Sequence, residues 1–171
     1  KGRLKLQNVG LLKVKWHREL QGVVKTVTVQ HHNGKWSVIF SCEIKETSLV
    51  TPQTCVGLDV GLHSFVATSD HRLVENPRIL RKAERELKIQ QRIVSKRKLR
   101  GSNRKKAVGL LAKKHEKVKH TRKDFLHKLS RQLVDHYDQF FVEKLNVKAM
   151  VQNKYLSKSI ADASWTMFLQ F

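Results

Sequence analysis

The run Cys55-Val56-Gly57-Leu58-Asp59-Val60-Gly61-Leu62 decides the fold of this chain. Its branched apolar residues predict a buried strand, and Gly61 predicts the turn that follows it. Asp59 lies near the end of that strand, where a buried carboxylate must be paired, hydrogen-bonded or bound to a metal. Residues 64–68 predict a second strand, antiparallel to the first. The alternative is that Asp59 only caps the turn.

A second carboxylate stands in the same position of another predicted strand. Glu143 follows Phe140-Phe141-Val142, about eighty residues downstream of Asp59. A ribonuclease-H-like core begins with such a hairpin and places the downstream strand beside the first, so the two acids would meet at one edge. Converging carboxylates suit Mg²⁺ or Mn²⁺, which activate water and stabilise a leaving oxygen. The alternative for Glu143 is an ion pair with Lys144 or another base.

An ATPase of the actin or sugar-kinase type is a further reading of the Asp-x-Gly at Asp59. Such proteins need additional glycine-rich phosphate loops, and no Gly-Gly-Thr or Gly-Thr-Gly occurs in this sequence. The sequence therefore disfavours that class.

The charge of the chain predicts a nucleic-acid partner. Its 35 Lys and Arg residues against 14 Asp and Glu give a formal net charge of +21, which a polyanion would neutralise. An anionic membrane surface is the alternative. Between Arg81 and Lys123 there are 18 basic residues and 3 Glu. The apolar spacing there predicts two long helices, broken at Gly101-Ser102-Asn103, that form an antiparallel hairpin.

Nine basic residues of this hairpin are predicted to bind a nucleic-acid backbone. They are Lys96, Arg97, Lys98, Arg100, Arg104, Lys105 and Lys106 around the tip, with Arg122 and Lys123 further along. Neutralising several phosphates would give strong, salt-sensitive binding with little sequence preference. A solvated hairpin is the alternative, although solvated helices ordinarily mix both charges.

The first part of the chain is predicted to be a small β-sheet or barrel. Residues 11–16, 23–30 and 35–44 predict strands, and Asn33-Gly34 predicts the turn between the last two. The polar stretch 45–54 predicts a linker and a domain boundary.

Several single residues carry weaker predictions. Trp16 and Trp36 are predicted to lie in a core, with stacking on a ligand as the alternative. Cys42 and Cys55 are predicted to be reduced core residues, which is typical of a cytosolic protein. Asp162 is predicted to form a salt bridge, and the alternative is that it lines the cleft if its helix packs by the sheet.

Two predictions concern longer stretches. Residues 157–171 predict a helix. No apolar run is long enough to cross a bilayer.

Five blocks of the sequence together resemble the TnpB family, the transposon-encoded RNA-guided nucleases related to type V CRISPR effectors. The blocks are VGLDVGL at 56–62, ENPR at 75–78, RKDFLHKLS at 122–130, VEKLNVKAM at 142–150 and LSKSIADASW at 156–165. Their number and common order extend the resemblance over nearly the whole chain.

The resemblance implies a specific α/β architecture and activity. Residues 1–50 would be the C-terminal part of a wedge-like, oligonucleotide-binding-barrel-like domain, and residues 54–171 a RuvC-type domain with a ribonuclease-H-like core. Asp59 and Glu143 match the first and second catalytic acids. The family cuts target DNA by metal-assisted hydrolysis under a guide RNA, which implies a cytoplasmic protein associated with a bacterial or archaeal nucleoid.

The chain also departs from the family pattern. The family has Glu-Asp or Glu-His where this chain has Glu143-Lys144. The family's helical recognition region, four-cysteine zinc element and third acid have no counterpart in these 171 residues. We therefore expect a fragment, inactive alone as a nuclease, with zinc bound only in the missing part. The alternative is a non-catalytic nucleic-acid-binding remnant of a decayed transposase gene, and the third acid would discriminate between the two.

Overall fold

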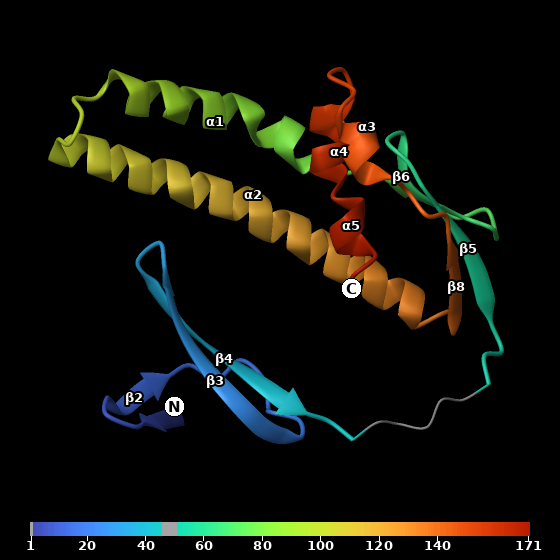
Figure 1. The fold of residues 1–171 in the computed structure, drawn as a ribbon, viewed down its shortest axis with the longest axis horizontal. Coiled ribbons are helices and arrows are strands. Elements are labelled where there is room, and N and C mark those ends of the chain that lie inside the picture. The colour runs from blue at the N-terminus through green and yellow to red at the C-terminus, as the bar shows by residue number, and fades with distance from the viewer. Residues whose placement is uncertain (1, 46–50) are drawn as a thin grey trace. The chain divides into compact units, whose positions relative to one another are not determined.

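The computed structural model describes residues 2–45 and 51–171. The chain divides into two units, Lys1–Val50 and Thr51–Phe171, and Figure 1 colours the first blue to cyan and the second cyan to red. The predicted linker falls partly on residues 46–50, outside the described residues.

The first unit consists of two antiparallel hairpins. Its strands are β1 (Gly2–Leu6), β2 (Gly10–Val14), β3 (Val23–His32) and β4 (Lys35–Glu43). Asn33 and Gly34 have φ of 50° and 77°, which is the conformation required by the predicted tight turn between β3 and β4. The two hairpins form separate two-stranded sheets, and β1 was not predicted from the sequence.

Side-chain exposure contradicts three of the predicted core residues. Trp36 is 73% exposed and lies against the ring of His31, so its assignment to a core is wrong. Trp16 is 40% exposed and stacks on Phe40 at 5.2 Å between ring centroids, so its assignment to a core is wrong as well. Cys42 is half-buried, whereas Cys55 is exposed, so the prediction that Cys55 is a core residue is also wrong.

A four-stranded sheet forms the second unit's framework, in the order β7-β6-β5-β8. Its strands are β5 (Cys55–Val60), β6 (Ser64–Thr68), β7 (Leu73–Glu75) and β8 (Gln139–Val142). The neighbours β5, β6 and β7 run antiparallel, and β8 runs parallel to β5. A parallel pair needs a long crossover connection, which the helices between β7 and β8 supply. The predicted mixed α/β class is confirmed.

Two long helices and three short ones complete this unit. They are α1 (Ile79–Lys96), α2 (Ser102–Val134), α3 (Val147–Val151), α4 (Ser157–Ala163) and α5 (Trp165–Phe168). Figure 1 shows α1 and α2 as the predicted antiparallel hairpin. The single helix predicted over 157–171 is broken at Ser164, which has φ 56° and ψ 42°. No helix in the described part of the chain is long and apolar enough to cross a membrane.

The core lies on one face of the sheet. Val56 and Leu58 of β5 are buried together with three leucines of α2 and with Trp165 and Phe168 of α5. The ring of Phe65 meets the ring of Phe168 edge to face at 5.3 Å. Side chains alternate between the two faces of a strand. The side chains of Cys55 and Asp59 therefore lie on the face of β5 opposite the core, and Gly57 stands between them on that face.

Candidate metal site and nucleic-acid interface

The parallel pairing of β5 and β8 puts side by side the two strand ends that carry the predicted acids. Leu58 pairs with Val142, and the same register continued by one residue sets Glu143, just past β8, beside Asp59. Matched positions of parallel strands face the same side of a sheet. Asp59 lies on the face of β5 opposite the core, Glu143 follows the end of β8, and both residues are exposed.

Neither acid is engaged within the described part of the protein. The side chains of Asp59 and Glu143 have no hydrogen bond or ion pair with another described residue, so the alternative pairing of Glu143 with Lys144 is not observed there. Two free carboxylates suit Mg²⁺, which usually takes one or two of them together with phosphate and water oxygens. Among the described residues, no three His, Cys, Asp or Glu side chains converge as a metal site. The binding of a divalent cation by these two carboxylates stays a prediction.

A tight turn fixes the end of β5. The amide of Gly61 donates to the carbonyl of Phe65 at 3.2 Å. A Cβ at Gly61 would lie 3.0 Å from the carbonyl oxygen of Ser64, which is closer than ordinary van der Waals contact. Glycine at this position therefore allows the chain to reverse two residues after Asp59.

A strand clamp, formed by Thr54 and Asp138, holds the other end of the β5–β8 pair. The Asp138 carboxylate accepts hydrogen bonds from the amides of Gln53 and Thr54 at 3.1 and 3.0 Å, and from the Thr54 hydroxyl at 2.9 Å. The Thr54 carbonyl accepts from the amides of Asp138 and Gln139, both at 3.0 Å. Since a slip of one residue turns every side chain to the other face, this clamp preserves the pairing that brings Glu143 to Asp59.

The clamp predicts that the stability of the chain depends on pH in the acid range. Donation by the Gln53 amide, then by the Thr54 hydroxyl and amide, holds the pKa of Asp138 below its usual range. A carboxyl with a lowered folded pKa contributes stability that is complete above its unfolded pKa, about 3.9, and is lost as pH falls through the folded pKa. We expect Asp138→Asn to lower the melting temperature at pH 6, with a smaller difference from the unmodified chain below about pH 3.

Thermal melting of the 171-residue chain between pH 2.5 and 6 would measure this. Asp135→Asn is the matched control, because among the described residues the Asp135 side chain pairs only with Arg131, at the exposed C-terminal end of α2. Equal melting of the two variants at pH 6 would contradict the role given to the clamp.

A second polar cluster ties the turn after β6 to the segment before β8. Asp70 accepts hydrogen bonds from the hydroxyls of Thr68 and Tyr137 and pairs with Arg72 at 3.1 Å. These contacts, that of Thr68 first, lower the pKa of Asp70, and the same carboxylate raises the pKa of Tyr137. Sequence reasoning missed this cluster, because Asp70 and Tyr137 are far apart in the chain.

The tip of the helical hairpin presents most of the predicted basic residues to solvent. The exposed ones are Lys96, Arg97, Lys98, Arg100, Lys105 and Lys106, and they are called the basic tip below. Arg104 instead donates to the Val94 carbonyl at 2.8 Å, where it satisfies the C-terminal end of α1. Lys123 is half-buried. Their contact with nucleic acid stays a prediction.

Arg122 has a different position from the one predicted for a backbone-binding residue. Its guanidinium pairs with Asp162 at 2.9 Å, and the two side chains are only 19% and 10% exposed. Both oxygens of Asp162 also lie 3.0 Å from the amide nitrogen of Leu80. Asp162, on α4, therefore joins the first turn of α1 to the middle of α2, which confirms the predicted salt bridge.

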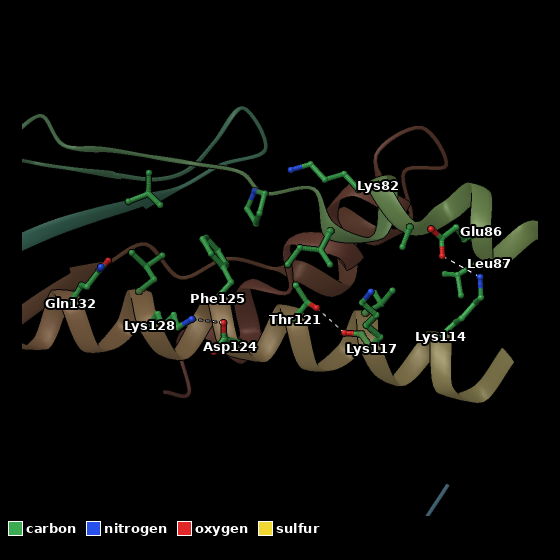
Figure 2. A pocket seen from close by; sticks show the side chains of 16 residues that line it. Lys82, Glu86, Leu87, Lys114, Lys117, Thr121, Asp124, Phe125, Lys128 and Gln132 are labelled. Carbon is green, nitrogen blue, oxygen red and sulfur yellow. Dashed lines mark hydrogen bonds and ion pairs between the residues drawn. The ribbon is translucent and has the colours of Figure 1, made fainter. Parts of the chain in front are cut away.

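A groove of about 650 Å³ runs between the first half of α1 and the middle of α2. Figure 2 shows its apolar floor, which includes Leu87 and Phe125, and its charged rim. Two rim lysines are paired, Lys114 with Glu86 at 3.1 Å and Lys128 with Asp124 at 2.7 Å. This surface is therefore more apolar and more balanced in charge than the basic tip.

Residues 39–154 match the family described as “Probable transposase”. Over 158 residues, the chain is 35% identical to a “Putative RNA-guided DNA endonuclease” of Streptomyces pristinaespiralis, a match that covers 91% of this chain and 39% of that protein. Over 179 residues, it is 26% identical to the “Putative RNA-guided DNA endonuclease InsQ” of Escherichia coli (strain K12), with 95% and 44% covered. The chain thus spans less than half the length of these curated relatives.

Proposed function

The chain belongs to the family described as “Probable transposase”, as its TnpB-like blocks predict, and from this premise we propose that it is part of an RNA-guided, metal-dependent DNA endonuclease. The observation that carries the proposal is the register of β5 and β8, which supports neighbouring positions for Asp59 and Glu143. The printed descriptions of the two relatives support guide RNA and target DNA as partners.

The proposed core is of the ribonuclease-H-like, RuvC type. Three features support it: an antiparallel β5-β6-β7 meander, a helical crossover, and a parallel β8 on the other side of β5. In this arrangement the neighbouring parallel strands β5 and β8 end at the same side of the sheet, so the acids at their ends would face the same substrate. The first unit would be the end of a wedge-like barrel domain.

Asp59 and Glu143 would hold Mg²⁺ or Mn²⁺ between them. Such an ion, when bound, activates water and stabilises the leaving oxygen of a phosphodiester. The two carboxylates would fix the position of the ion, and the strand clamp would fix the position of the carboxylates. The basic tip would hold the nucleic-acid backbone by charge. The family resemblance implies one further acid, which would lie outside these 171 residues.

Cleavage of a guide-matched plasmid tests the proposal. We expect a longer protein that contains this chain to cut the plasmid with Mg²⁺ or Mn²⁺ and a matched RNA. EDTA or an unrelated RNA should prevent cutting, and the 171-residue chain alone should not cut. Metal-independent cutting, or cutting that ignores the RNA, would contradict the proposed function. Robust cutting by the 171 residues would show that two acids suffice.

A non-catalytic nucleic-acid-binding protein is the second candidate, and the exposed basic tip supports it as much as the first. Both candidates predict the same binding behaviour. We expect the chain to bind DNA or RNA with an affinity that falls roughly 10³- to 10⁵-fold between about 50 and 200 mM salt, if 6–10 phosphates are neutralised. A mobility-shift series that is flat with salt would contradict this expectation.

Two triple variants with equal loss of charge locate the binding surface. The tip variant carries Lys98→Gln, Arg100→Gln and Lys105→Gln, and the control carries Lys114→Gln, Lys128→Gln and Arg131→Gln. All three control residues are paired with carboxylates. The salt slope of the tip variant should decrease by about 0.9 for each phosphate that the protein no longer neutralises, with a smaller change in the control. Equal salt slopes for the two triple variants would show that the basic tip is not the main binding surface.

A further inference from the structure

A cavity of about 300 Å³ lies beside the turn that follows Asp59. Its lining includes His63 from the turn between β5 and β6, and Arg78 and Arg81 from the start of α1. All three side chains are exposed, and none has a hydrogen bond or ion pair with another residue in the described ranges. Three groups able to carry positive charge thus line one cavity without a counter-ion of their own.

Asn76 brings the two sides of this cavity together. Its side-chain amide donates to the Leu62 carbonyl at 3.1 Å, and its side-chain oxygen accepts from the Arg78 amide at 3.1 Å. Arg78 itself has φ 48° and ψ 50°, a left-handed conformation that is uncommon for residues other than glycine. Such backbone strain concentrates at functional sites, and here it fixes an arginine beside the cavity.

The carboxylate that lines the cavity does not neutralise these groups. Asp162 is already bound by the Arg122 guanidinium at 2.9 Å and by the Leu80 amide at 3.0 Å. The amide of Leu80 is therefore also occupied, and the cavity depends on its side chains rather than on the end of α1. Its free charge is positive.

We propose that this cavity binds a phosphodiester group of a nucleic-acid strand. The planar guanidinium forms paired, charge-assisted hydrogen bonds with phosphate oxygens, and the cavity offers two such groups. The turn that carries His63 begins directly after β5, at the strand end where Asp59 and Glu143 lie. Resting here on the proposed function, we assign to the cavity a phosphate of the strand that reaches these acids.

Nuclear magnetic resonance of the 171-residue chain tests binding directly, with EDTA present. The probe is a 5′-phosphorylated thymidine dinucleotide, compared with inorganic phosphate and with thymidine. We expect the side-chain signals of Arg78, Arg81 and His63 to shift and saturate with the dinucleotide. Arg85 and Arg92, exposed on the same helix outside the cavity, should shift only at concentrations about tenfold higher.

Matched variants separate a local site from general attraction. Arg78→Gln with Arg81→Gln should weaken dinucleotide binding at His63 about tenfold, whereas Arg85→Gln with Arg92→Gln, which removes equal charge, should not. Arg78→Lys keeps the charge without the planar fork and should be intermediate. Shifts of Arg85 and Arg92 that match those of the cavity residues would overturn the proposal. Inorganic phosphate that binds as tightly as the dinucleotide would overturn the assignment to a nucleic-acid backbone.

The proposal for the cavity and the proposal for the acid pair can be contradicted independently of each other. Asp59→Asn should abolish cleavage by a longer protein and leave the dinucleotide shifts in this chain unchanged. In that longer protein, Arg78→Gln with Arg81→Gln should reduce kcat/KM more than the Arg85 and Arg92 variant does. If the shifts occur while Asp59→Asn has no effect on cleavage, the proposed function fails and the phosphate site stands.

Discussion

Replacement of Asp59 by Asn is expected to reduce metal-dependent DNA cleavage more than about 100-fold, because loss of outer-shell partners alone costs roughly 10- to 100-fold. Asparagine keeps the size of the side chain and one oxygen but removes the negative charge that holds a divalent ion. Glu143→Gln should have a similar effect, since its position beside Asp59 assigns it to the same ion. Affinity for nucleic acid should change little in both variants, because the basic tip is intact.

Single-turnover cleavage of a guide-matched plasmid by a longer protein would measure this effect, with RNA binding followed in parallel. Glu75→Gln is the matched control, since Glu75 is an exposed carboxylate of the same sheet, on β7. Calorimetric titration of the 171-residue chain with Mn²⁺ gives a second readout without catalysis. If Asp59→Asn cuts as fast as the unmodified protein, the assignment of Asp59 to the site is wrong. If Glu75→Gln loses as much cleavage rate as Asp59→Asn, the effect comes from the loss of any negative charge on the sheet and not from a metal ligand.

Replacement of Arg122 by Ala is expected to destabilise the second unit by about 3–5 kcal/mol, the usual cost of removing one partner from a buried ion pair. The pair is mostly enclosed, with 19% of Arg122 and 10% of Asp162 exposed. Asp162→Ala should cost at least as much, because it also deprives the Leu80 amide of its acceptor. Arg122→Met combined with Asp162→Leu should cost less than either single change, since no charge is then left without a partner.

Urea unfolding followed by the helical circular dichroism signal would measure these differences, because all helices of the described residues belong to the second unit. Lys128→Ala is the control, since its pair with Asp124 is 72% and 61% exposed, and such surface pairs contribute about 0–1 kcal/mol. If Arg122→Ala costs no more than Lys128→Ala, the pair does not stabilise the fold.

Local patterns predicted the strands and turns well. The branched residues around Asp59 gave the β5–β6 hairpin, Asn33-Gly34 gave the turn of β3 and β4, and the break at Gly101 separated α1 from α2. Each of these depends on neighbours in sequence, where backbone preference and side-chain period are directly readable. The two acids were predicted in the same way, from their positions at strand ends, and their role stays a prediction.

Features that depend on distant residues could not be predicted. The alternation along β5 shows that Cys55 and Asp59 share a face, but it does not show which face the helices cover, so Cys55 was assigned to the core. The partner of Asp138 is 84 residues away, at Thr54, and no local pattern connects them. The break at Ser164 was missed because the apolar spacing of a helix continues through it. No local pattern marks a serine with a left-handed backbone conformation.

The uneven burial along the helical hairpin has a consequence for its dynamics. The 33 residues of α2 span about 50 Å, yet Leu126, Leu129 and Leu133 in its last turns pack into the core, while the part near the tip has Ala107 and Val118 as its buried residues. Amide hydrogen exchange should therefore be slow at the end of α2 and progressively faster toward the tip.

Ionic strength then acts on the tip in two opposite directions. Salt screens the repulsion among its crowded cations, so exchange there should slow as salt rises. The same salt weakens its hold on a polyanion. The condition that best orders the free hairpin is thus the one in which it binds nucleic acid least, and a bound strand should order the tip most strongly at low salt.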